Sequence, residues 1–172
     1  DNSDPTSYDR SPYNIGLTDF ILRFGSSRER CKILKGFLEY RAKLHELGFV
    51  DGFQWLNGSF LEHIEITEAR DPNDIDVVTL FRIPTETQDS IVDNNGWLFD
   101  TDWLKHTYFV DGYYVDLGVE ADTLLVIGTY WYGLWSHRRN NIWKGFAQVN
   151  LDPSEDDVAM QTLLQTGYIE VV

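Results

Sequence analysis

The sequence predicts a mixed α/β domain of the α+β class, in which helices flank a sheet. Apolar residues recur at three- and four-residue spacing across residues 27–47, which is typical of an amphipathic helix. Residues 74–81 are rich in Ile, Val and Thr, which indicates a strand. Asp111-Gly112 separates two further β-rich runs and is a strong hairpin signal. Helices mixed with a partly hairpin-built sheet are typical of this class.

Residues that break regular structure predict the boundaries of the first elements. Residues 1–16 are rich in Asp, Ser, Pro and Asn and predict an extended or disordered leader, which leaves residues 17–172 as a single domain. A short apolar piece, residues 17–24, ends at Gly25-Ser26-Ser27, which offers an N-cap to the long helix. Gly48 is the expected C-cap of that helix.

The later elements follow from β-rich runs and weaker helical patterns. The expected strands are residues 53–56, 74–81, 107–110, 113–119 and 146–151. The expected helices are residues 85–92, 97–106 and 121–135, and a last one from Pro153 to about Gln165 that opens on acidic residues.

Composition and charge limit the classes of function that the chain can have. Of the 172 residues, 42% are hydrophobic, which suffices for a sizeable core. No apolar run is long enough for a membrane span and Cys31 is the only cysteine, so we expect no membrane contact, no internal disulfide and a cytoplasmic location. The net charge of −14 argues against broad contact with nucleic-acid backbones. It leaves open a small polyphosphate bridged by divalent ions, or a basic protein partner.

Carboxylates in β-rich segments indicate a metal site. Asp74 and Asp76 are two residues apart, so their side chains share one face of a strand and repel each other unless a cation lies between them. Mg²⁺ prefers carboxylate and phosphate oxygens. Asp116 is the best third carboxylate, because Val115 and Leu117 flank it. Asp111 competes, but the turn signal at Gly112 explains it, and Glu120 lies at the end of the run.

Gly58-Ser59 follows a strand and precedes a short helical segment. Free N–H groups at a helix start bind phosphate, and glycine permits close backbone approach. Together with Asp74 and Asp76, the pair predicts one site for a nucleoside triphosphate and its metal ions. Three alternatives stay open: a hairpin turn at Asn57-Gly58, an accidental glycosylation sequon at Asn57–Ser59, and a solvated acidic turn before the strand.

These residues resemble the polymerase-beta-type nucleotidyltransferase superfamily, with Gly-Ser, a spacer, Asp-x-Asp and a third Asp. The strings GSF and P-x-DIDVV, and the tail TYWYGLWSHRRNNIWKGFAQVNL, more narrowly resemble small stand-alone bacterial nucleotidyltransferase-like proteins of uncharacterised function, over about residues 30–151. The resemblance implies a mixed sheet with flanking helices. It implies that Gly58 and Ser59 grip the triphosphate, and that Asp74, Asp76 and Asp116 hold two Mg²⁺ (or Mn²⁺) ions. The 14-residue spacer, residues 60–73, is slightly longer than in compact members.

The segment 130–146 mixes aromatic and basic residues. Arg138, Arg139 and Lys144 are candidate nucleotide-binding residues, because arginine holds phosphates and aromatic rings stack on bases. The alternative is a core-packing helix followed by a polar loop.

The expected activity is transfer of a nucleoside monophosphate, from ATP or another triphosphate, to a hydroxyl. The acceptor hydroxyl attacks the α-phosphorus in line and pyrophosphate leaves. A protein acceptor suits the acidic chain better than RNA does. By analogy with small stand-alone members, a toxin–antitoxin or phage-defence setting and a partner protein are expected. The alternative is a catalytically silent protein of this fold that binds nucleotide or a protein partner. An acidic mimic of nucleic acid is a third hypothesis.

Overall fold

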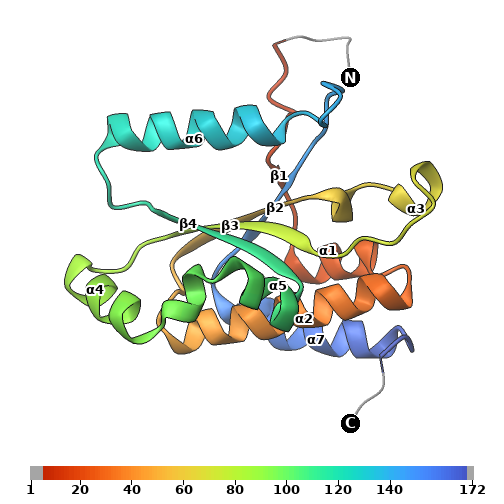
Figure 1. The fold of residues 1–172 in the computed structure, drawn as a ribbon, viewed down its shortest axis with the longest axis horizontal. Helices are drawn as coiled ribbons and strands as arrows, with labels where there is room; N and C mark the ends of the chain where they lie inside the picture. Colours follow the sequence, from red (N-terminus) through yellow and green to blue (C-terminus); the bar gives the residue numbers. More distant parts are fainter. Residues whose placement is uncertain (1–5, 170–172) are drawn as a thin grey trace.

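The computed structural model describes residues 6–169, and these form the expected mixed α/β fold. A five-stranded mixed sheet has the order β1-β5-β2-β3-β4 (Figure 1). Its strands are β1 (Tyr13–Asn14), β2 (Gly52–Asn57), β3 (Ile75–Phe81), β4 (Val110–Asp116) and β5 (Ala147–Asn150). The helices are α1 (Leu17–Phe24), α2 (Arg28–Glu46), α3 (Ile64–Thr67), α4 (Thr85–Asn94), α5 (Thr101–Tyr108), α6 (Ala121–Trp135) and α7 (Asp156–Gln165). Short 3₁₀ turns are η1 (Ser59–Leu61), η2 (Gly96–Phe99) and η3 (Pro153–Glu155).

Helix α2 begins and ends where its caps require. The Ser27 hydroxyl accepts a hydrogen bond from the Arg30 backbone N–H, and Gly48 just beyond the last turn has a φ of +91°. The apolar side chains at helical spacing are buried, as the pattern predicts: Cys31, Leu34, Phe37, Leu38 and Leu44.

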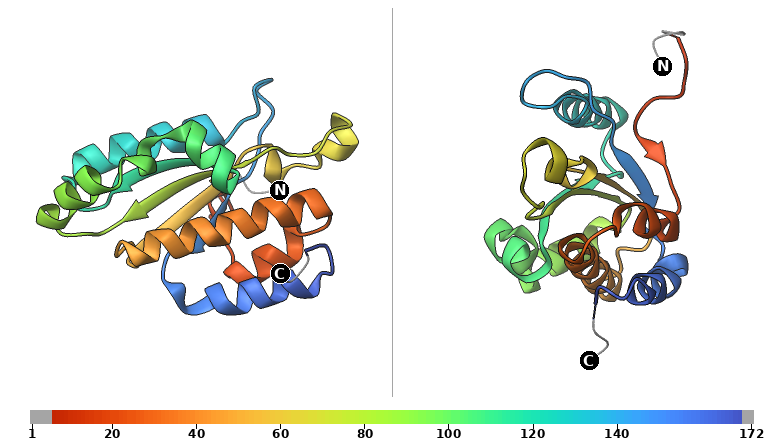
Figure 2. Two further views of the ribbon diagram at one scale, coloured as in Figure 1. Left: turned by 60° about the horizontal axis from the view of Figure 1, so that its bottom comes forward. Right: turned by 90° about the vertical axis from the view of Figure 1, so that its right-hand side faces the viewer.

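The two faces of the sheet carry separate apolar clusters. On one face, α1, α2, α5 and α7 pack around a large core that includes Ile75 and Val77 of β3. On the other face, α6 packs alone over Val78, Leu80 and Val115. Figures 1 and 2 show α6 on the opposite side of the sheet from α1, α2 and α7. Within residues 6–169, no helix combines the length and apolarity that a membrane crossing requires.

Two expectations for the N-terminal and central segments are wrong. Tyr13 and Asn14 are not part of a leader but form β1, which pairs with β5 in parallel. The leader's first five residues, 1–5, lie outside the described residues. Asp111-Gly112 is not a hairpin turn, because it lies inside β4, and residues 107–108 belong to α5.

Gly112 has a packing role that the turn interpretation missed. A Cβ atom at this position would lie 3.1 Å from Leu104 Cδ1 and 3.2 Å from the Tyr40 hydroxyl. Strand β4 runs parallel to β3, and the segment with α4 and α5 forms the crossover between them. The parallel pairing determines which carboxylates meet.

Candidate functional site

Polar side chains from three neighbouring strands form one row at the end of the sheet. Asp76 of β3 lies opposite Asn57 of β2 and opposite Asp111 of β4. Residues paired in this way point to the same face of a sheet. That face is the one covered by α6, because Val78 of β3 and Val115 of β4 pack there. Asp74 directly precedes β3, and its charge raises the pKa of Asp76. We call Asp74, Asp76 and Asp111 the carboxylate cluster.

Asp116 does not belong to this row, so its assignment as the third carboxylate is wrong. It lies opposite Phe81, five residues along β4 from Asp111, which corresponds to roughly 16 Å. An odd separation also turns its side chain to the other face of the sheet. There the Asp116 carboxylate accepts hydrogen bonds from Gln88 Nε2 at 2.9 Å and from the Gly118 backbone N–H at 2.7 Å. The carboxylate that joins Asp74 and Asp76 is Asp111.

The cluster holds more negative charge than its neighbours neutralise. Lys105 Nζ lies 2.7 Å from Asp111 Oδ2 and 3.7 Å from Asp74 Oδ2. Burial, reinforced by the charges of Asp74 and Asp111, raises the pKa of Asp76 to about 6. Burial also raises the pKa of Asp74. Lys105 forms the ion pairs of this cluster and Lys144 acts on Asp76 through its charge, but burial and the neighbouring carboxylates outweigh both, so Asp76 holds its proton more tightly.

The donor chemistry of this row fits a divalent cation. Asn57 Oδ1 and Asp111 Oδ1 are buried and accept no hydrogen bond from the described residues. Unsatisfied oxygens beside surplus carboxylate charge are the ligands that Mg²⁺ and Mn²⁺ prefer. No three His, Cys, Asp or Glu side chains in residues 6–169 converge into a preformed metal centre. Lys105 lies among the carboxylates instead, so a metal ion would have to displace its ammonium group.

Gly58 and Ser59 lie directly beside this row. Gly58 has a φ of +84°, and a Cβ atom there would lie 3.0 Å from Asp76 Cγ. The chain enters η1 at Ser59 rather than turning back into a strand, which rules out a hairpin turn at Asn57-Gly58. The structure brings Gly58, Ser59 and Asp76 together, and their role in holding a triphosphate with Asp74 stays a prediction.

An open cleft of about 810 Å³ joins these residues to the basic segment that follows α6. Its lining includes Gly58, Ser59, Asp76, Arg138, Arg139 and Lys144. The walls also carry aromatic side chains of β4 and α6, including Tyr113, whose ring centre lies 4.9 Å from that of Trp131. The structure therefore brings together the predicted glycine, serine, basic residues and Asp76 in one concave surface.

Glu62 orders the basic side chains of the cleft. Its carboxylate pairs with Arg138 Nε at 2.8 Å and with Lys144 Nζ at 2.8 Å. Lys144 Nζ also donates to the Gly58 carbonyl oxygen at 2.7 Å. Arg139 is exposed and forms no ion pair with another residue of the range 6–169. Lys144 thus ties the 136–146 segment to the glycine turn beside Asp76.

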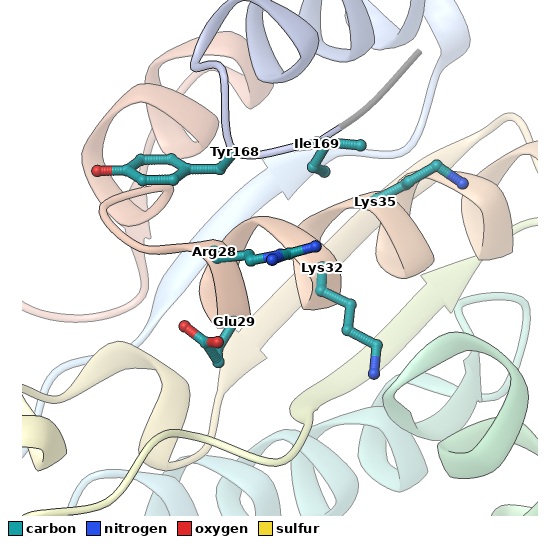
Figure 3. A pocket seen from close by; sticks show the side chains of 6 residues that line it. All are labelled: Arg28, Glu29, Lys32, Lys35, Tyr168 and Ile169. Atoms are coloured by element: carbon teal, nitrogen blue, oxygen red, sulfur yellow. The ribbon is translucent and has the colours of Figure 1, made fainter. Parts of the chain in front are cut away.

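Another hollow, of about 540 Å³, lies between the start of α2 and the C-terminal segment. Figure 3 shows Lys32 and Lys35 on its rim pointing in different directions, with Tyr168 and Ile169 on the other side. Because these cations do not converge, we assign no function to this hollow.

Four residues of the cleft and the carboxylate row escaped sequence reasoning. The turn signal at Gly112 explains Asp111 locally, Asn57 stands out only through an open turn alternative, and Lys105 and Glu62 lie in segments without a motif. The alternation of Asp111 with Tyr113 and Val115 along one run was the available signal for a strand position.

No curated protein and no solved structure shows significant similarity to the chain. One family profile matches residues 3–150, and the description of that family states no activity. The match leaves the resemblance to nucleotidyltransferases as a prediction. The chain belongs to this family of unknown function, DUF6932.

Proposed function

We propose that the protein is a metal-dependent nucleotidyltransferase that moves a nucleoside monophosphate from a nucleoside triphosphate to an acceptor hydroxyl. The observation that carries the proposal is that Asp76, in register with Asn57 and Asp111, lines a basic, aromatic-walled cleft together with Gly58. Carboxylates, a glycine turn and clustered cations in one concavity are the features expected of phosphoryl-group chemistry.

The triphosphate is held at the glycine turn. The Gly58 backbone permits close approach, the Ser59 hydroxyl and N–H add donors, and Lys144 and Arg138 lie on the same cleft. Both cations are paired with Glu62, so phosphate binding requires them to exchange a carboxylate for a phosphate oxygen. Exposed Arg139 is available to the phosphate tail without such an exchange.

Asp74, Asp76 and Asp111 would supply oxygen ligands for two Mg²⁺ or Mn²⁺ ions, in place of the ammonium group of Lys105. When bound, divalent ions neutralise the phosphates and lower the pKa of the acceptor hydroxyl. One carboxylate of the cluster would accept the proton of the acceptor hydroxyl. The acceptor oxygen forms a bond to the α-phosphorus, the bond to the bridging oxygen breaks, and pyrophosphate leaves.

A protein is the favoured acceptor, because a chain of net charge −14 repels an RNA backbone. A cytoplasmic toxin–antitoxin or phage-defence system with a partner protein is the setting we propose for this activity, with ATP as the first triphosphate to test.

A catalytically silent protein of the same fold is the second candidate. The observation in its favour is Lys105, which neutralises Asp111 and Asp74 from within the chain. If Lys105 stays there permanently, the cleft binds a nucleotide or a protein without turnover.

Calorimetry with each of the four ribonucleoside triphosphates, with and without Mg²⁺, tests the proposal. The wild type, Asp76→Asn and Asp111→Asn are compared with Asp157→Asn, which changes an exposed carboxylate on α7. Mg²⁺-dependent binding that both cleft variants lose and Asp157→Asn keeps supports the site. Transfer of label from an α-³²P triphosphate to protein then separates an enzyme from a silent binder. Absence of any triphosphate binding by the folded wild type overturns both nucleotide readings.

A further inference from the structure

A cavity of about 230 Å³, partly open to solvent, lies on the face of the sheet opposite to the cleft. It is bounded by α4, η2 and the ends of β3 and β4, and its lining includes Phe49, Phe81, Phe99, Tyr114 and Asp116. Drug-sized ligands occupy pockets of roughly 300–1,000 Å³, so this cavity suits a smaller molecule.

Four aromatic side chains line the cavity and pack against one another. Phe49 and Phe81 lie 4.8 Å apart between ring centres at 67°, and Phe99 and Tyr114 lie 5.6 Å apart at 63°. Phe49 and Tyr114 are 6.1 Å apart and link the two pairs. Phe99 is 56% exposed, so the aromatic wall can be reached from solvent.

Asp116 gives this aromatic wall a negative charge. Its two carboxylate oxygens accept hydrogen bonds from Gln88 and from the Gly118 N–H, both of which are neutral donors. Among residues 6–169, no Lys, Arg or His nitrogen forms a salt bridge with Asp116. The charge of Asp116 is therefore held in place but not neutralised by the chain.

We propose that this cavity binds a small organic cation with an alkylated ammonium head. Aromatic faces attract such cations through the ring quadrupole, and the carboxylate adds a charge of opposite sign. A bare divalent ion is disfavoured because it needs six or more oxygen ligands, and the walls are mostly apolar. An anion would meet the charge of Asp116, and a neutral apolar molecule would leave that charge unpaired.

The site is separate from the proposed nucleotide cleft. Asp116 and Asp111 are on the same strand but point to opposite faces of the sheet. Cation binding at this cavity can therefore be tested independently of triphosphate binding at the cleft.

Titration with tetramethylammonium, followed by protein NMR shifts, tests the proposal on the whole chain. We expect saturable shifts at the cavity residues, and binding about tenfold weaker in Asp116→Asn, which corresponds to loss of one charge contact. Asp93→Asn, an exposed carboxylate on α4, is the matched control and should bind as the wild type does. The neutral analogue tert-butanol should bind much more weakly than tetramethylammonium.

Phe99→Leu provides a second variant, because Phe99 is largely exposed and its loss should leave the fold intact. It should weaken tetramethylammonium binding severalfold, since a cation–π contact is lost while an apolar side chain remains. If tert-butanol binds as well as tetramethylammonium, or if Asp116→Asn and Phe99→Leu both bind as the wild type does, the proposal is wrong. Should Asp116→Asn fail to fold, the Phe99→Leu result decides.

Discussion

Asp76 of β3 and Asp111 of β4 lie directly opposite each other in parallel register. Two carboxylates in this relation repel each other. Within residues 6–169, Lys105 is the one cation that forms ion pairs in this cluster, with Asp111 and with Asp74. The pKa of Asp76 rises to about 6 in response to burial and these charges. A cationic ligand that binds here would reduce the repulsion between these carboxylates.

Asp111→Asn should abolish the Mg²⁺-dependent part of triphosphate binding. The substitution preserves the shape of the side chain but removes the charge that pairs with Lys105, and loss of a metal ligand typically weakens metal affinity by at least about 10- to 100-fold. Calorimetry at fixed triphosphate and varied Mg²⁺ measures the change. Unaltered Mg²⁺ dependence would remove Asp111 from the proposed site.

The stability of the wild type should fall as pH rises, because of Asp76. Its pKa is 3.8 in the unfolded reference and about 6 in the fold, so between these values the native state binds more protons than the unfolded state. Stability is then highest below the lower value and decreases until pH passes about 6. Asp76→Asn removes this loss, and the gain over wild type should be larger at about pH 8 than at about pH 4, by about 3 kcal/mol at most.

Urea unfolding at the two pH values checks this expectation. Mg²⁺ at about pH 8 should stabilise the wild type and have little effect on Asp76→Asn, since the ion offsets the same repulsion. A gain that is the same at both pH values would show that burial of Asp76 does not perturb its ionisation.

Lys105→Met tests whether the lysine competes with a metal ion. Without metal, the variant should be less stable at about pH 8 by about 1–3 kcal/mol, because it leaves Asp111 and Asp74 without their counter-charge. With Mg²⁺, it should bind the ion more tightly than the wild type does. Lys43→Met is the control, because Lys43 pairs with Glu46 on the exposed face of α2. Weaker Mg²⁺ binding by Lys105→Met would mean that Lys105 assists the ion instead of competing with it.

The fold class and most of the cleft could be predicted from sequence, for identifiable reasons. Helix α2 combines an apolar period with Ser27 and Gly48 at its ends, so local signals agree. Gly58 and Ser59 lie beside Asp76 because they directly follow β2, and β2 pairs with β3, the next strand along the chain. The third carboxylate needs the register between two parallel strands separated by a crossover, and no local pattern encodes that register.

Asp111 shows how a strong local signal can mislead. Asp-Gly between β-rich runs favours a turn, but here Gly112 lies inside β4, where a Cβ atom would lie only 3.1 Å from Leu104 Cδ1 and 3.2 Å from the Tyr40 hydroxyl. The turn interpretation excluded Asp111 from the predicted metal site, and Asp116 took its place because Val115 and Leu117 flank it. Asp116 is the last residue of β4 and lines another cavity.

Arg41→Met should destabilise the fold more than any exposed charge substitution. Arg41 is fully buried, pairs with both oxygens of Asp156 on α7, and donates to Gln54 of β2 and to the backbone carbonyls of Asn150 in β5 and Asp152 after it. Removing one partner of a buried ion pair costs about 3–5 kcal/mol, because the remaining charge stays buried and unpaired. Urea unfolding of Arg41→Met beside Lys43→Met measures the difference. A loss as small as that of the control would show that Asp156 reaches solvent when Arg41 is absent.

Gly58→Ala, compared with Gly48→Ala, separates backbone strain from contact with the carboxylate row. Both glycines have positive φ, +84° and +91°, and Gly58 also has a ψ of −178°, a conformation that is almost restricted to glycine, so alanine costs about 1–3 kcal/mol of backbone strain there. At Gly48 nothing lies within 4 Å of the added Cβ, whereas at Gly58 the Asp76 Cγ lies at 3.0 Å. We expect Gly58→Ala to lose further stability and, because Asp76 must move, to weaken Mg²⁺-dependent triphosphate binding about tenfold or more. Unfolding midpoints and calorimetry on the two variants provide the comparison. Equal losses of stability with unchanged binding in both would mean that the Gly58 turn does not position Asp76, and the proposed grip on the phosphate tail would lose its main support.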